Sequence, residues 1–131
     1  MRRFDMSDNF STAFSNDDLY ILISLGKKYG FDPLSSIECE EYLLELLQKY
    51  DERLGDKYSY IENAISKSFI SYEHKPNWVQ TADWQFDMAK PMLFVGQKEI
   101  TMVNGQITFN YTFYIFWNTT TGKVKTVIQS D

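Results

Sequence analysis

Two side chains of this sequence have the types needed for nucleophilic catalysis, Cys39 as a nucleophile and His74 as its base. They are the single cysteine and the single histidine among 131 residues. Cys39 stands in a leucine-rich segment beside glutamates, and acidic neighbours raise a thiol pKa rather than lower it. His74 has no H-x-x-E or H-E-x-x-H pattern around it, so a zinc site is not predicted. We therefore predict a protein that is not an enzyme, with no catalytic residues, metal or cofactor.

Regularly spaced glutamates form the main charged motif. Glu38, Glu41, Glu45 and Glu52 are 3, 4 and 7 residues apart and fall on one stripe of a predicted helix, opposite its leucines. Such carboxylates could bind the basic cleft of a nuclease in place of phosphates. The alternative, which we favour, is a solvated helix face on which Glu45 pairs with Lys49.

Charge is unevenly distributed along the chain. The net charge is −5, and residues 1–70 hold 13 acidic and 8 basic side chains, whereas residues 71–131 hold 5 of each. Affinity for nucleic acid comes mainly from Lys and Arg, so nucleic acid is not the predicted partner. A basic protein is favoured instead, because complementary charge speeds encounter.

Composition and hydropathy indicate one domain in a reducing compartment. Hydrophobic residues make up 44% of the chain, which suits a folded core. The longest apolar run, YILISL at 20–25, is much shorter than the roughly 20 residues of a membrane span, so no membrane partner is predicted. A lone cysteine agrees with a cytoplasmic location. We expect a single domain over residues 1–131, with residues 1–14 as a flexible arm.

Three helices are predicted in the N-terminal half. The first begins at Ser15 or Asn16 and ends near Gly30. The second begins at Ser35, which has capping-box spacing to Glu38, and ends at Gly55. The third covers Tyr58 to Ile70. Apolar residues recur at helical spacing in each: Leu19, Leu22, Ile23 and Gly26 in the first, the predicted buried stripe Leu43, Leu47, Tyr50 and Leu54 in the second, and one face with Tyr58, Ile61, Ile65 and Phe69 in the third.

Strands are predicted from Pro76 onward, where the hydrophobic period changes to two. Side chains along the segment 107–117 alternate between two faces of the strand. The face predicted to lie in the core holds Ile107, Phe109, Tyr111, Phe113, Ile115 and Trp117. Asn104-Gly105 indicates a hairpin, and Thr119 to Gly122 indicate a turn into a last strand. The predicted fold is α+β, with three N-terminal helices packed on an antiparallel sheet of about four strands.

Four aromatic residues each allow two interpretations. Trp78 and Trp84 lie six residues apart in PNWVQTADWQ and either fill the core, which we favour, or form a binding surface. Tyr114 and Phe116 fall on the otherwise polar face of the 107–117 strand. Either the third helix covers them, or they form an exposed docking patch.

The segment W-V-Q…W…K-P-M-L-F-V-G-Q, from Trp78 to Gln97, with the aromatic strand and glycine hairpin that follow, resembles immunity proteins of bacterial polymorphic toxin systems, such as contact-dependent growth inhibition. The resemblance implies a non-enzymatic inhibitor that binds its cognate toxin domain, with a nuclease as the first candidate, and covers the active site. The residues that we select as candidate partner contacts are Glu38, Glu41, Glu45, Glu52, Trp84, Tyr114 and Phe116.

A second interpretation belongs to another class of protein. The order of helices and strands is also similar to nuclear-transport-factor-like domains, which enclose a small apolar ligand or substrate. That interpretation requires an internal cavity lined by Phe109, Tyr111, Phe113 and Trp117, with inward carboxylates. A filled core with an acidic or aromatic outer surface favours the inhibitor.

Overall fold

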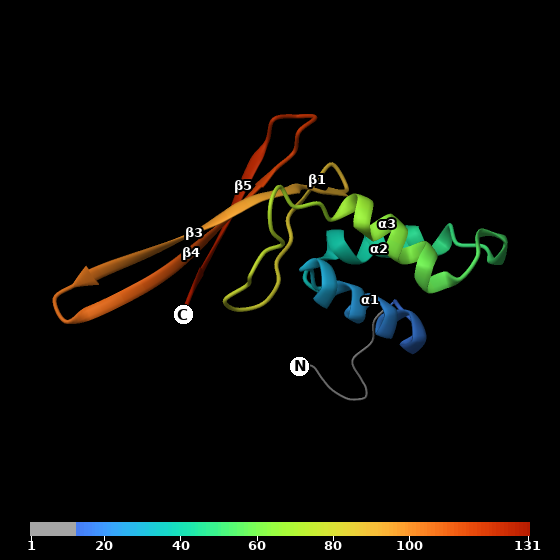
Figure 1. Ribbon diagram of the computed structural model, residues 1–131, viewed down its shortest axis with the longest axis horizontal. Coiled ribbons are helices and arrows are strands. Elements are labelled where there is room, and N and C mark those ends of the chain that lie inside the picture. The colour runs from blue at the N-terminus through green and yellow to red at the C-terminus, as the bar shows by residue number, and fades with distance from the viewer. Residues whose placement is uncertain (1–12) are drawn as a thin grey trace.

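The computed structural model describes residues 13–131, which form three helices followed by two small antiparallel sheets (Figure 1). This order confirms the predicted α+β class with N-terminal helices. Most of the predicted flexible arm, residues 1–12, lies outside the described residues. Phe14, at the end of that predicted arm, is a buried member of the core.

Helix α1 (Asn16–Tyr29) has the predicted boundaries. The Ser15 side chain accepts a hydrogen bond from the backbone N of Asp18 at 3.2 Å, and Gly30 ends the helix with a φ of +96°. Leu22 and Leu25 are buried, but Ile23, which shares the helical spacing of Leu19, Leu22 and Gly26, is 42% exposed. The other helices cover a narrower face of α1 than the sequence pattern suggested.

Helix α2 (Ile37–Gln48) is shorter than predicted. Ser36, rather than Ser35, caps it by accepting a hydrogen bond from Cys39 N at 3.1 Å. After Gln48 the chain turns, and Asp51 caps a separate 3-10 turn, η1 (Glu52–Leu54), through Arg53 N. This break explains why Leu54, predicted to be buried, is 54% exposed. The fully buried residues of α2 are Cys39 and Leu43.

Helix α3 (Lys57–Ser68) packs beside α1 and α2 and places Ile61, Ile65 and the following Phe69 in the core, as predicted. Tyr58, predicted to share that face, is 38% exposed. Two ion pairs join α1 to α3. Lys28 pairs with Glu62, and Lys57 Nζ lies 2.6 Å from Asp18 Oδ1.

The strands form two antiparallel sheets, where the sequence suggested one sheet of about four strands. Strands β1 (Phe86–Asp87) and β2 (Lys90–Pro91) make a short ribbon. Strands β3 (Leu93–Asn104), β4 (Ile107–Trp117) and β5 (Val124–Ser130) form a sheet in the order β3-β4-β5. The predicted hairpin at Asn104-Gly105 joins β3 to β4, and Gly105 has a φ of +67°. The predicted turn ending at Gly122 joins β4 to β5.

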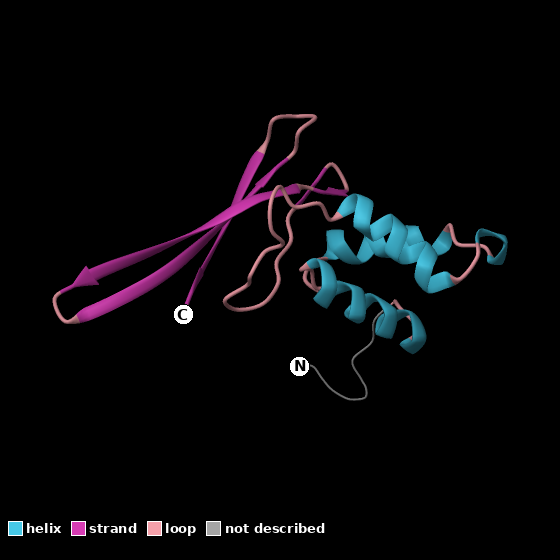
Figure 2. Ribbon diagram, in the orientation of Figure 1, coloured by secondary structure: helices cyan, strands magenta, loops and turns pink. Residues whose placement is uncertain are grey.

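The helices lie at one end of the three-stranded sheet, and the β3–β4 hairpin extends away from them (Figures 1 and 2). Residues 70–72 run beside the start of β3, where Phe94 N donates to Ile70 O at 2.9 Å and Tyr72 N donates to Phe94 O at 2.8 Å. Toward the hairpin tip, every residue from Lys98 to Asn110 is exposed. Only the base of the sheet therefore contributes to the core.

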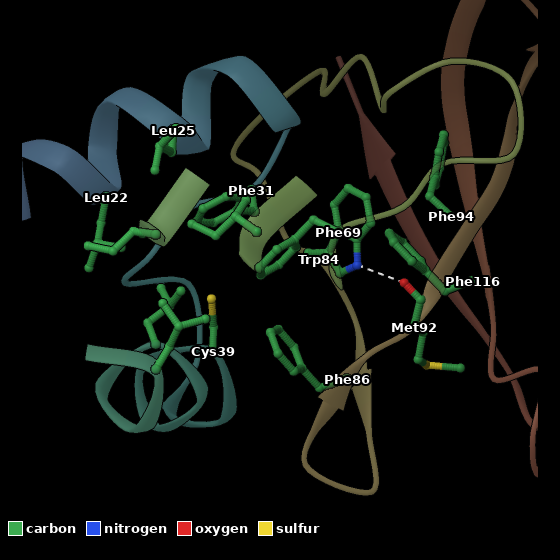
Figure 3. Close-up of a cluster of buried hydrophobic side chains, with 14 of the residues drawn as sticks. Leu22, Leu25, Phe31, Cys39, Phe69, Trp84, Phe86, Met92, Phe94 and Phe116 are labelled. Carbon is green, nitrogen blue, oxygen red and sulfur yellow. Dashed lines mark hydrogen bonds between the residues drawn. The ribbon is translucent and has the colours of Figure 1, made fainter. Parts of the chain in front are cut away.

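Aromatic rings join the helices to the base of the sheet (Figure 3). Trp84 is 1% exposed, and its Nε1 donates to Met92 O at 2.9 Å. Its ring centroid lies 5.3 Å from that of Phe69 and 5.4 Å from that of Phe116. These edge-on contacts link the end of α3 to β4.

The face of β4 predicted for the core is the wrong one. Thr112, Tyr114 and Phe116 are buried, whereas Ile107, Phe109 and Trp117 expose 58%, 40% and 41% of their surface. The residues from Phe113 to Trp117 are apolar on both faces, so alternation could not decide between them. Packing by Trp78, Trp84 and Phe94 decided it.

Candidate functional site

The aromatic candidates Trp84, Tyr114 and Phe116 are core residues. Tyr114 and Phe116 are 0% exposed, so they do not form the exposed docking patch that was one of the two alternatives. The Trp78 ring stacks on Tyr114 with a centroid distance of 4.3 Å, and Trp78 Nε1 donates to Gly30 O at 2.7 Å. Trp84 is therefore a core residue, as we favoured, and Trp78 is half-buried and packs against the core.

Tyr114 also holds the loop that precedes the sheet. Its hydroxyl accepts a hydrogen bond from Val79 N at 2.8 Å and donates one to Asn77 O at 3.0 Å. Burial raises the pKa of this hydroxyl above its usual value, so it stays protonated and can donate. Gln129 holds the next residues of the same loop, because its Oε1 accepts from Gln80 N and its Nε2 donates to Thr81 O.

The candidate glutamates are exposed but do not form one stripe. Glu38, Glu41 and Glu45 lie on the outer side of α2, whereas Glu52 belongs to η1, beyond the end of that helix. Glu45 Oε1 lies 3.9 Å from Lys49 Nζ, the pairing expected for a solvated helix face. An exposed pair of this kind contributes little to stability.

The most distinctive surface is the outward face of the three-stranded sheet, which we call the open sheet face. Strand register places these side chains on it: Leu93, Lys98, Ile100 and Met102 from β3; Ile107, Phe109, Tyr111, Phe113, Ile115 and Trp117 from β4; Val124, Thr126, Ile128 and Ser130 from β5. This is the side opposite Tyr114 and Phe116. None of its apolar residues belongs to the core cluster or packs against it.

Seven large apolar side chains on the open sheet face are well exposed, each by 40–58%: Ile100, Met102, Ile107, Phe109, Trp117, Val124 and Ile128. Lys98 is its single charged residue. The four remaining apolar residues are half-buried by their neighbours within the sheet. A contiguous surface of this size and composition is typical of a protein–protein interface.

A groove of about 670 Å³ adjoins the open sheet face at the base of the sheet, and Leu93 and Trp117 line both. Met88 of the β1–β2 turn also lines the groove, and in this turn Met88 and Ala89 have φ values of +55° and +64°. Asp87 stabilises the groove by accepting hydrogen bonds from Asn118 Nδ2 at 2.8 Å and Thr121 Oγ1 at 3.2 Å. The Asn118 bond contributes most to holding the pKa of Asp87 below its ordinary value.

Cys39 and His74, the residues considered for nucleophilic catalysis, occupy different environments. Cys39 is 0% exposed, and burial raises the pKa of its thiol to about 12, so the thiolate is absent at neutral pH. His74 is exposed, with its Nε2 4.0 Å from Glu73 Oε1. Among residues 13–131, no three His, Cys, Asp or Glu side chains gather in a way that could hold a metal ion.

The open sheet face is the functional candidate that sequence reasoning missed. One signal for it was present, since β3 alternates Lys98, Ile100 and Met102 with polar residues and pairs with the apolar residues of β4. The sequence pattern instead predicts that these apolar residues of β4 lie in the core.

No protein-family model, curated protein or solved structure matches this chain. In the part of the chain that the structure describes, no helix has the length and apolar character of a membrane span.

Proposed function

We propose that this protein is an immunity-type inhibitor, which binds a cognate bacterial toxin domain through the open sheet face and covers the toxin's active site. Binding through the open sheet face is supported by the exposure of seven large apolar side chains on that one face. The resemblance of residues 78–97 to immunity proteins supports the identity of the partner, with a nuclease as the first candidate.

The physical argument for docking is the cost of leaving this surface in water. Removal of apolar surface from water lowers the free energy by about 25 cal/mol per Å². The open sheet face also has the composition of an interface core, because it is rich in aromatic residues and Met and poor in charge. The adjoining groove offers a recess for one protruding side chain of the partner, between Met88 and Trp117.

The acidic helix surface has a secondary role in this proposal. Glu38, Glu41 and Glu45 are exposed, and they attract a basic toxin domain over distances up to about 10 Å at moderate salt. Charges of this kind mainly speed association, whereas apolar contacts determine how long the complex lasts. The inhibitor acts in the cytoplasm, without turnover, cofactor or nucleic acid of its own.

The positions of the four aromatic residues expected to line a ligand pocket favour the inhibitor over the pocket domain. Phe109 and Trp117 are exposed on the open sheet face, and Tyr111 and Phe113 lie between them on the same strand face. The pocket interpretation required these four rings to surround an internal cavity. Their position instead matches the aromatic outer surface expected of the inhibitor.

A growth-protection experiment tests the proposal. We predict that the gene immediately upstream encodes a large secreted protein with a variable C-terminal domain, and that domain is the toxin partner to use. Cells that express this domain should survive with the wild-type protein and die with Phe109→Glu or Ile128→Glu, which place a charge on the open sheet face. Val103→Glu is the matched control, because Val103 is 70% exposed on the opposite face of the same hairpin. Failure of the wild type to protect, or full protection by Phe109→Glu, would refute the proposal.

A further inference from the structure

We infer that, in the absence of a toxin, two copies of this chain pack their open sheet faces against each other. The face is then covered in the free protein, and a toxin must displace one copy to reach it. The pairing is argued from the surface itself, whereas the displacement step rests on the proposed function.

The exposed area is close to what a stable dimer needs. The seven exposed side chains would together contribute roughly 500 Å², if each offers on the order of 150 Å² and half of that is exposed. Leu93, Tyr111, Phe113 and Ile115 add further area. A standard interface buries about 800 Å² on each partner, and the apolar patches of monomers seldom exceed about 600 Å².

Charge permits the pairing of like chains at this surface. The chain carries a net charge of −5, but residues 93–131 hold three basic and two acidic side chains. The acidic excess therefore lies elsewhere, and the helices that carry much of it are at the other end of the sheet from the hairpin (Figure 1). Lys98 lies on the edge strand β3, where its long side chain can reach water beside a partner.

The open sheet face also has both projecting side chains and an open position, as a two-fold interface requires. In such a pair each copy presents the same patch, so the patch must hold both projections and hollows. Phe109, Phe113 and Trp117 project from the central strand. Gly96, paired with Ile115 beside these rings, adds no side chain to the face and leaves open space there, since a Cβ built at this position would meet no atom within 4 Å. Sheets packed in this way lie about 10 Å apart with their side chains interdigitated.

Sedimentation velocity of the purified chain, without any toxin, tests the pairing. From low micromolar to several hundred micromolar, the wild type should shift from monomer to dimer. Phe109→Glu should raise the dimer dissociation constant by at least about 30-fold, as expected for loss of a central apolar contact. Val103→Glu should dimerise like the wild type. Circular dichroism of all three proteins verifies that they are folded.

Three results would overturn the inference. The wild type could stay monomeric throughout, or Phe109→Glu could leave the dimer intact, as expected if copies join through the β3 edge instead. Val103→Glu could also dissociate the dimer as strongly as Phe109→Glu, which would place the contact on the wrong face. A monomeric wild type that still protects cells would refute only the pairing. A dimer that fails to protect would refute only the proposed function.

Discussion

Tyr114 illustrates how its neighbours decide what one side chain does. By type it is a good docking residue, and the sequence places it on the more polar face of its strand. The structure stacks it on Trp78 and gives its hydroxyl two backbone partners, Val79 and Asn77. A contact of this kind, between residues about 35 positions apart, leaves no trace in local periodicity.

Burial within α2 sets the effect of truncating a leucine there. Leu43 is 0% exposed, so Leu43→Ala should lower the free energy of unfolding by about 2–5 kcal/mol through the cavity that it leaves. Leu54→Ala is the matched control, because Leu54 is 54% exposed and its loss should cost less than about 1 kcal/mol. Urea unfolding measures both. Equal costs would show that Leu43 is not buried more deeply than Leu54. Leu47, central to the stripe predicted from sequence, is only half-buried and should give an intermediate value.

The Cys39 thiol should make stability fall in alkaline solution. Its pKa is about 12 in the folded protein, against about 8.5 for an unfolded thiol. Between these values the unfolded chain releases a proton that the folded chain keeps, so rising pH favours unfolding. Relative to Cys39→Ala, which lacks this titration, the wild type should lose roughly 1–2 kcal/mol of unfolding free energy between about pH 8 and pH 10. A constant difference between the two proteins across this range would disprove the raised pKa.

At the scale of single elements, the sequence predicted the boundaries of α1 and the turns of the three-stranded sheet, but not the end of α2 or the buried side of β4. The caps Ser15 and Gly30, and the turns at Gly105 and Gly122, lie where the sequence predicts them, because each depends on its own side chain or backbone freedom. The buried side of β4 depends on which rings the rest of the chain supplies. A strand that is apolar on both sides carries no local information about that choice.

The β1–β2 turn is an element that the sequence did not reveal. Met88 and Ala89 both have positive φ, where non-glycine residues are strained and where Asn-Gly is the usual choice. Ala89→Gly should therefore stabilise the protein by up to about 1 kcal/mol, because relief of strain exceeds the added chain entropy. The same change at Ala64, inside α3, should destabilise it by about 1 kcal/mol. Thermal unfolding that shows a loss at both positions would contradict the strained turn.

For the whole molecule, the sequence predicted the fold class, but it did not predict that the core occupies one end and that the sheet extends beyond it at the other. The helices and the base of the sheet share one aromatic core, and the rest of the sheet extends beyond it (Figures 1 and 3). A core that ends partway along a sheet cannot be read from hydrophobic pattern, since apolar residues continue to the hairpin tip. The aromatic residues chosen from sequence lie in the core, and the acidic ones are exposed on α2 and η1. The surface with the composition of an interface is the one that had been assigned to the core.

The central proposal is that another protein binds the open sheet face. Calorimetric titration of the cognate toxin domain into wild type, Phe109→Glu and Val103→Glu, at several temperatures, tests this claim most directly. At low micromolar concentration, where the wild type is monomeric, binding should show a clearly negative heat-capacity change, because apolar surface is buried. Phe109→Glu should weaken binding by at least about 30-fold. Val103→Glu should bind as the wild type does. Equal affinities for wild type and Phe109→Glu, with both variants folded, would show that the toxin does not bind the open sheet face.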